Sequence, residues 1–172
     1  MITGRRYAAL DGHDGCGKST LARAVAERVG AQVVRPYPDS LGDHIAWLWG
    51  SKRFAEADVL ARSSIERVLE LTDPARPVLF DRCWSTMFTV LPESYWQAWH
   101  PLCPTVLCHA DTRVVMDRLA QRGEDVGDFE EHEYYQKLYR SHAELTPDTL
   151  VIDTTDRPLD DCVAEIVEFL SW

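Results

Sequence analysis

Residues 12–19 have the spacing G-x-x-x-x-G-K-[ST], and no other stretch constrains the fold of this chain as strongly. Glycines at such positions lack the Cβ atom that would keep a ligand away, so successive backbone N–H groups can surround a phosphate. Lys18 would carry positive charge to the β- and γ-phosphates, and Ser19 would offer a hydroxyl to Mg²⁺. The spacing therefore predicts a nucleotide-binding loop whose contacts come from Gly12, Gly15, Cys16, Gly17, Lys18, Ser19 and Thr20.

The segments on either side of this loop support the same interpretation. Residues 7–10 are apolar and predict a short strand, and residues 20–29 place Leu21, Val25 and Val29 on one face of a helix. A phosphate in the loop would thus also meet a helix amino terminus, where unpaired N–H groups and the helix dipole favour negative charge.

The rest of the chain alternates apolar runs with amphipathic ones. Further strands are predicted at 32–35, 77–80, 105–109 and 150–153. Helices are predicted at 41–49, 54–71, 112–121, 130–144 and from residue 160 onward. Residues 85–99 are aromatic and predict helix with a break or new start at Pro92, and the polar residues 124–128 predict a loop.

Five short strands that alternate with helices predict an α/β fold, in which a parallel sheet has helices on both faces. Residues 1–172 fit a single domain, and 45% hydrophobic residues suffice for its core. Ligands of such sheets bind at the carboxyl ends of the strands. The nucleotide is therefore expected beside Asp81 and the region from Arg118 to Asp128.

The composition bears on partners and location. A net charge of −10 argues against nucleic acid or an anionic membrane as a partner, and no run of 18 apolar residues predicts a membrane span. The five cysteines are odd in number and lack C-x-x-C pairs, so neither disulfides nor a zinc site are predicted. With no apolar signal region before the first strand, we expect a cytoplasmic protein.

Taken in order, these segments resemble thymidylate kinases and related P-loop nucleoside and nucleotide kinases over residues 7–170. The resemblance rests on the loop with Asp14 two residues after its first glycine, on Asp58-Val59-Leu60-Ala61-Arg62, and on the strand-end pair Asp81-Arg82. It continues through a lid-like segment at about 118–130 and a final strand and loop at 151–155. It implies a P-loop kinase fold with a short lid, and ATP and Mg²⁺ as cofactors.

The resemblance also implies roles for single residues. Asp14 would bind a sugar hydroxyl of the acceptor, and Arg62 its base or phosphate. Arg82 would bind the acceptor phosphate, with Asp81 near Mg²⁺ and the attacking oxygen. Lid arginines, matched by Arg118 and Arg122, would reach the transferring phosphoryl group, and residues 151–155 would hold adenine. A homodimer through residues 54–71 is a further expectation, although an amphipathic helix of a monomer has the same pattern.

The sequence leaves the acceptor open. The family usually places an arginine just after its second strand, whereas Tyr37-Pro38-Asp39 offers an acid here and Arg35 lies four residues before it. A nucleoside monophosphate such as dTMP is the leading acceptor. A nucleoside or nucleoside-like metabolite is the alternative, with Asp39 or Asp81 as general base. A nucleotide-binding regulatory domain without acceptor turnover is the non-enzyme alternative.

Overall fold

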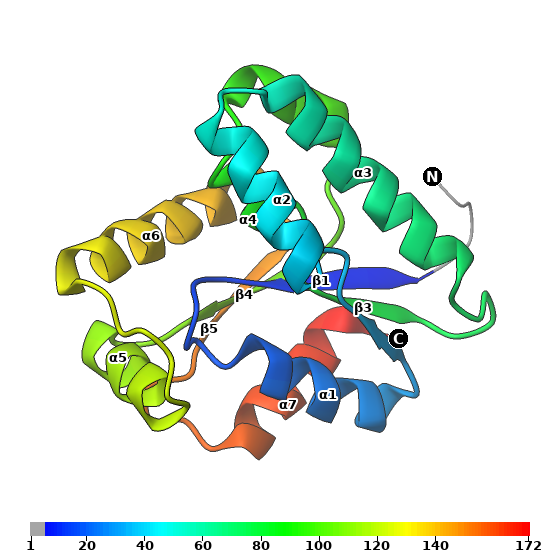
Figure 1. Cartoon of the computed structure of the whole chain (residues 1–172). Coiled ribbons are helices and arrows are strands. Elements are labelled where there is room, and N and C mark those ends of the chain that lie inside the picture. Colours follow the sequence, from blue (N-terminus) through cyan, green and yellow to red (C-terminus); the bar gives the residue numbers. More distant parts are fainter. Residues whose placement is uncertain (1–5) are drawn as a thin grey trace.

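The structure, a computed structural model, describes residues 6–172. Its elements run in the order β1 (Tyr7–Asp11), α1 (Lys18–Val29), β2 (Gln32–Val34), α2 (Asp39–Gly50), α3 (Phe54–Glu70), β3 (Val78–Asp81), α4 (Trp84–Phe88), η1 (Glu93–Trp99), β4 (Thr105–His109), α5 (Thr112–Gln121), α6 (Phe129–His142), η2 (Ala143–Leu145), β5 (Thr149–Asp153) and α7 (Leu159–Leu170) (Figure 1). The predicted α/β class is confirmed.

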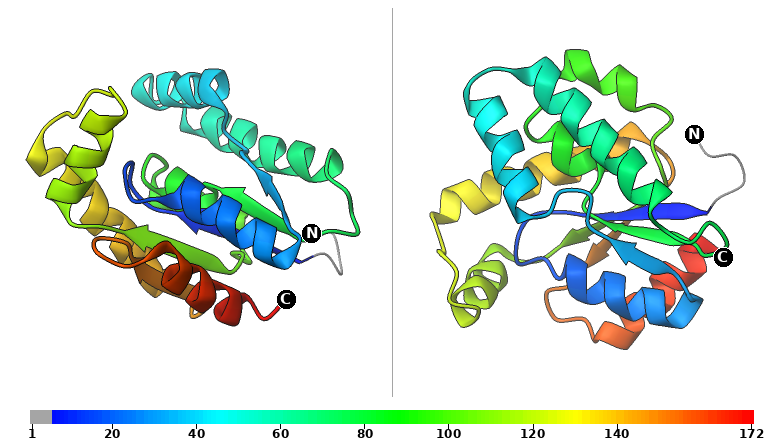
Figure 2. Two further views of the ribbon diagram at one scale, coloured as in Figure 1. Left: turned by 90° about the horizontal axis from the view of Figure 1, so that it is seen from below. Right: turned by 45° about the vertical axis from the view of Figure 1, so that its right-hand side comes forward.

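The five strands form one parallel sheet in the order β2-β3-β1-β4-β5. Side chains of β1 alternate between its two faces, as strand geometry requires. Ala8 and Leu10 belong to a core with α1, α5 and α7, whereas Ala9 belongs to a second core with α3 and α4. Helices α1 and α7 lie side by side against the first face (Figures 1 and 2). Helices therefore cover both faces of the sheet.

The aromatic segment is broken at Pro92, as predicted, although its second piece is a 3₁₀ helix. Residues 85–99 form two short pieces, the five-residue helix α4 and the 3₁₀ helix η1, with Pro92 at the start of the second. The two pieces fold onto each other, since the rings of Phe88 and Trp96 stack with centroids 4.4 Å apart. Packing of these rings, and not the regular spacing of one long helix, therefore sets the shape of this segment.

The strand register sets the functional edge of the sheet. Leu10 of β1 pairs with Asp81 of β3, and Asp11 pairs with Leu107 of β4. The carboxyl ends of three adjacent strands therefore lie together, and the loop before α1 begins at the middle one. No helix within residues 6–172 is long and apolar enough to cross a membrane.

Candidate active site

The glycines of the loop at 12–17 adopt conformations that other residues rarely reach. Gly12, Gly15 and Gly17 have φ values of 136°, 78° and 85°. A Cβ on Gly12 would lie 2.2 Å from the carbonyl oxygen of Cys108 in β4. The loop can therefore follow this path between β1 and α1 only with glycine at position 12.

Lys18 lies at the start of α1 and is almost fully buried. Its ammonium donates a hydrogen bond of 2.7 Å to the carbonyl oxygen of His13 and lies 3.9 Å from the carboxylate of Asp14. Burial, with a smaller contribution from the nearby Arg82, lowers the pKa of Lys18. A phosphate entering the loop would replace the His13 carbonyl as the partner of this ammonium.

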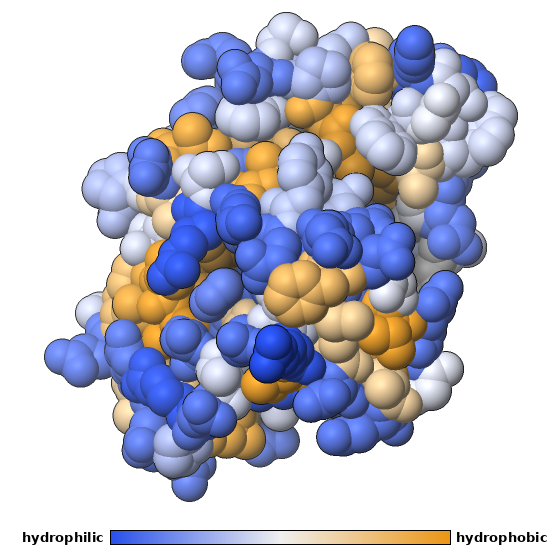
Figure 3. All heavy atoms as spheres, turned by 90° about the vertical axis from the view of Figure 1, so that its left-hand side faces the viewer, coloured by the Kyte–Doolittle hydropathy of each residue, from blue (hydrophilic) through white to orange (hydrophobic). Residues whose placement is uncertain are grey.

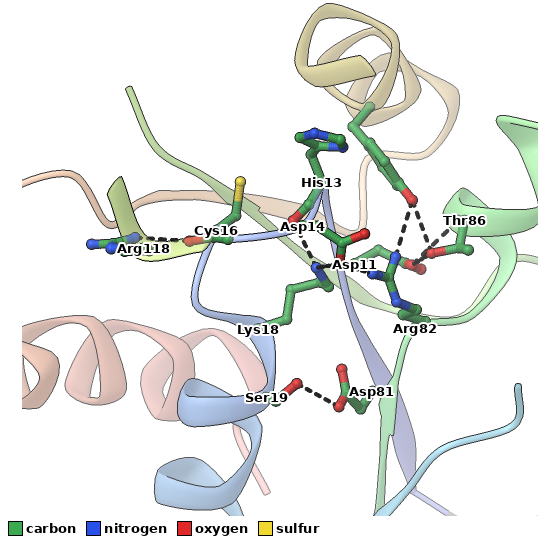
Figure 4. Close-up of polar contacts among 12 residues, drawn as sticks. Asp11, His13, Asp14, Cys16, Lys18, Ser19, Asp81, Arg82, Thr86 and Arg118 are labelled. Atoms are coloured by element: carbon green, nitrogen blue, oxygen red, sulfur yellow. Dashed lines mark hydrogen bonds and ion pairs between the residues drawn. The ribbon is translucent and has the colours of Figure 1, made fainter. Parts of the chain in front are cut away.

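Ser19 and Asp81 meet beside the loop (Figure 4). The Ser19 hydroxyl donates to Oδ2 of the buried Asp81 at 2.7 Å, while Oδ1 of Asp81 is buried with no hydrogen-bond partner among residues 6–172. A hydroxyl next to a carboxylate oxygen that lacks a partner suits Mg²⁺, which prefers oxygen ligands. Arg35, at the end of β2, places its Nε 3.8 Å from Oδ2 of Asp81. The sequence interpretation gave Arg35 no role, because its proximity to Asp81 arises only when β2 and β3 pair.

Arg82 follows β3 in a left-handed backbone conformation, with φ 77°. Non-glycine residues in this region carry strain and concentrate at functional sites. Its guanidinium forms an ion pair with the carboxylate of Asp14 and lies 3.5 Å from the Tyr139 hydroxyl on α6. Although burial acts to raise the pKa of Asp14, Arg82 and Lys18 hold it below the ordinary value. Two predicted acceptor residues, Asp14 and Arg82, are thus brought together.

Asp11 holds the chain next to Arg82, although the sequence predicted no role for this residue. Its buried carboxylate accepts hydrogen bonds from the N–H of Cys83 at 3.0 Å and from the hydroxyl of Thr86 at 2.6 Å. The Tyr139 hydroxyl in turn donates to the Thr86 hydroxyl at 3.1 Å. These bonds fix the backbone directly after Arg82. An acid at the end of the strand before the loop was the only signal for Asp11 in the sequence.

The two predicted lid arginines differ in their surroundings. Arg118 donates to the carbonyl oxygens of Gly15 at 3.1 Å and Thr154 at 2.7 Å, so it joins the loop to the segment after β5. Arg122 is half exposed and forms an ion pair with Glu124 at 3.1 Å. Both arginines fall in the segment predicted as a lid, but backbone carbonyls hold Arg118, whereas Arg122 pairs with a neighbouring side chain.

A cavity of about 370 Å³ opens beside the loop. Its lining comes from the phosphate-binding loop, α1, α5 and the segment from β5 into α7: Gly15, Gly17, Thr20, Leu21, Arg118, Gln121, Arg122, Thr154, Arg157, Leu159 and Cys162. Cys16 is fully buried next to it, and its carbonyl accepts a bond from the Thr154 hydroxyl at 3.1 Å. The cavity adjoins the region where the resemblance places adenine.

The structure places one predicted substrate residue, Arg62, away from this group. Arg62, on α3, binds the buried carboxylate of Asp58 with Nη2 2.7 Å from Oδ2, and Asp58 also accepts from the Trp99 indole at 2.8 Å. Arg62 also lines a separate cavity together with Tyr7, at the opposite end of β1 from the loop. Asp39 begins α2, and its side chain lies outside what the structure describes.

No known protein-family model matches this chain, and no curated protein matches it. Solved structures do. Deoxyadenosine kinase from M. mycoides aligns with 96% of this chain and 98% of its own, at 14% identity and a TM-score of 0.64. The YorR protein of Bacillus subtilis, in complex with phosphorylated GDP, aligns with 96% and 95%, at 18% identity and a TM-score of 0.60.

Thymidylate kinase from Candida albicans aligns with 97% of this chain and 91% of its own, at 14% identity and a TM-score of 0.65. The alignments span nearly the whole chain in each case. The fold is therefore that of the P-loop nucleoside and nucleotide kinases, which confirms the resemblance seen in the sequence at the level of fold.

Proposed function

We propose that this chain is a kinase that uses ATP and Mg²⁺ to phosphorylate a nucleoside monophosphate of the dTMP kind. One observation carries the proposal. The strand-end pair Asp81-Arg82 meets the phosphate-binding loop through the Ser19–Asp81 and Asp14–Arg82 contacts (Figure 4). A loop suited to donor phosphates therefore faces a cation and a carboxylate suited to an acceptor.

The donor half follows from the loop. Lys18 and the loop amides would hold the β- and γ-phosphates, and the cavity of about 370 Å³ would hold the nucleoside part of ATP. Ser19 and Asp81 would hold Mg²⁺, which neutralises charge on the transferring group. Arg122 would approach the same phosphates from the lid. Phosphoryl transfer needs in-line positioning and positive charge more than covalent help, and these side chains offer both.

The acceptor half is built around two arginines. Arg82, held by Asp14 and Tyr139, is the cation closest to the loop on the acceptor side. Arg35, which directly follows β2 because that strand ends at Val34 and not at the predicted residue 35, adds a second cation 3.8 Å from Asp81. Two guanidinium groups near the attacking position favour an acceptor that itself carries a phosphate.

A nucleoside or nucleoside-like metabolite is the second candidate acceptor. The buried Oδ1 of Asp81, which has no hydrogen-bond partner among the described residues, favours it, because a carboxylate oxygen near a hydroxyl can accept its proton. The third candidate function is a regulatory domain that binds a nucleotide without acceptor turnover. A measurement of acceptor-dependent ATP consumption distinguishes this candidate from the two kinase candidates.

The deciding experiment measures ATP consumption with Mg²⁺ against a panel of nucleosides and nucleoside monophosphates, with each product identified by mass. We expect turnover with a monophosphate such as dTMP. Turnover confined to nucleosides would favour the second acceptor class and Asp81 as base. Tight ATP binding with no turnover on any compound would contradict the kinase proposal.

A further inference from the structure

Two histidines connect the phosphate-binding loop to the lid. His13 is the second residue of the loop, and its Nε2 lies 2.6 Å from Nδ1 of His132 on α6. The other ring nitrogen of His132, Nε2, is hydrogen-bonded to the carbonyl oxygen of Val126, in the segment between α5 and α6. A side-chain bridge therefore spans residues that are more than a hundred positions apart in the sequence.

Hydrogen-bond chemistry determines which ring nitrogens of the two histidines can carry a hydrogen. A carbonyl oxygen only accepts, so Nε2 of His132 carries a hydrogen. With both rings neutral, Nδ1 of His132 is then a bare acceptor and Nε2 of His13 donates to it. If both rings were protonated, each nitrogen of the 2.6 Å contact would carry a hydrogen, and the bond would be lost.

The surroundings favour the neutral arrangement. The His13 ring stacks on Tyr135 with centroids 5.6 Å apart and planes 7° apart, and His132 is buried. Burial lowers the pKa of His13 to about 4. The charged groups that face the pair are Asp14, Lys18 and Arg82 at the loop and Glu124, Asp125 and Glu131 at the lid and α6.

A cavity lies beside the two histidines. A cavity of about 220 Å³ lies between the loop and the lid, lined by both histidines, Asp14, Val126 and Gly127 among others. On the side of the molecule that carries α5 and α6, polar side chains surround apolar hollows (Figure 3). Arg122, which lines the donor cavity, pairs with Glu124, two residues before Val126. Fixing Val126 therefore restricts the Glu124 carboxylate that holds the Arg122 guanidinium.

We propose that His13 and His132 are positioning residues that fasten the lid to the phosphate-binding loop through their hydrogen-bonded rings and thereby hold Arg122 at the donor site. The kinetic consequence rests on the proposed kinase function, whereas the structural consequence does not. Neither histidine touches the reacting atoms in this account. Their effect is on the equilibrium between a fastened and a released lid.

The test compares His132→Phe with the wild-type protein and with His44→Phe, which makes the same change at an exposed histidine on α2. Hydrogen exchange of residues 122–128 is measured by mass spectrometry on the ligand-free protein at pH 7. We expect exchange at least about tenfold faster in His132→Phe, because the substitution removes the hydrogen bonds of His132 to His13 and to Val126, and no change in His44→Phe. Unchanged exchange in His132→Phe would overturn the proposal.

Two further readouts separate fastening from general loss of structure. Combining His13→Phe with His132→Phe should add nothing to the exchange rate of His132→Phe alone, whereas additive effects would show that the two rings act independently. His13→Phe alone, which removes the ring that His132 contacts, should also speed the exchange of residues 122–128. Unchanged exchange in His13→Phe would contradict a fastening role for the contact between the two rings.

If the kinase proposal holds, His132→Phe should lower kcat/KM for ATP about tenfold and leave the acceptor KM within about twofold. A His132→Phe enzyme with faster exchange but unchanged kinetics would overturn the role of the bridge at the donor site. An absence of turnover in the wild type would instead contradict the kinase proposal and leave the exchange result standing.

Discussion

At the scale of single residues, the candidate site consists of side chains that are each held by another part of the chain. Lys18 is held by the carbonyl of His13, Ser19 by Asp81, and Arg82 by Asp14 and Tyr139. Substrate binding would exchange these internal partners for phosphate oxygens. Substitutions at these positions should therefore affect turnover more than folding.

Lys18→Ala tests the donor side. We expect kcat/KM to fall about a hundredfold or more, because one charge aimed at the transferring phosphoryl group is lost. Circular dichroism should show an unchanged fold. Lys137→Ala is the matched control, since Lys137 is exposed on α6 and pairs with Glu133. Full activity in Lys18→Ala would refute its assignment to the donor phosphates.

Arg82→Lys tests the acceptor side. A lysine keeps the charge but loses the planar fork that binds a phosphate with two hydrogen bonds. The acceptor KM should rise about tenfold or more, while the affinity for ATP, measured by calorimetry, should change by less than about threefold. Equal losses for both ligands would undo the division of the site into donor and acceptor halves.

At the scale of elements, the loop at 12–17 depends on its close approach to β4. Regular periodicity predicted most helices and strands to within about two residues, because it records which side chains each element buries. At 85–99 it predicted the break at Pro92 but not the 3₁₀ form of the second piece, whose Trp96 stacks on Phe88 of the first. Loop conformation likewise depends on neighbours such as Cys108.

Two glycine substitutions separate the cost of a steric contact with β4 from the cost of a positive φ alone. Gly12→Ala should destabilise the protein by about 3 kcal/mol or more, because its Cβ would lie 2.2 Å from a backbone oxygen and its φ of 136° is strained for alanine. Gly30→Ala should cost only about 1 kcal/mol, since position 30 has φ 68° and open space around it. Urea unfolding measures both, and equal costs would show that the contact with β4 is unimportant.

At the scale of the whole molecule, the second core contains a buried histidine. His142 is surrounded by the rings of Trp84, Phe88, Trp96 and Tyr139, and its Nδ1 lies 2.9 Å from the Ser85 hydroxyl. Its Nε2 is buried and has no hydrogen-bond partner in the part of the chain that the structure describes. Burial lowers its pKa from 6.5 to about 4.

The sign of the resulting pH dependence follows from linkage. Between pH 6.5 and 4 the unfolded chain binds a proton at this histidine and the folded chain does not, so acid favours unfolding. The free energy of unfolding should fall by up to about 1.4 kcal/mol per pH unit through this group. His142→Phe should reduce that slope, measured by urea unfolding at several pH values, and His44→Phe should not. An identical slope in His142→Phe would contradict the buried neutral histidine.

The sequence by itself determined the α/β class and the place of the glycine-rich loop between the first strand and the first helix. It did so because the loop is contiguous and because periodicity reports which face of each element is buried. Only the tertiary structure decided how distant polar groups meet. Arg35 at Asp81, Asp11 at Thr86 and His13 at His132 become neighbours through strand pairing and helix packing, which leave no local pattern.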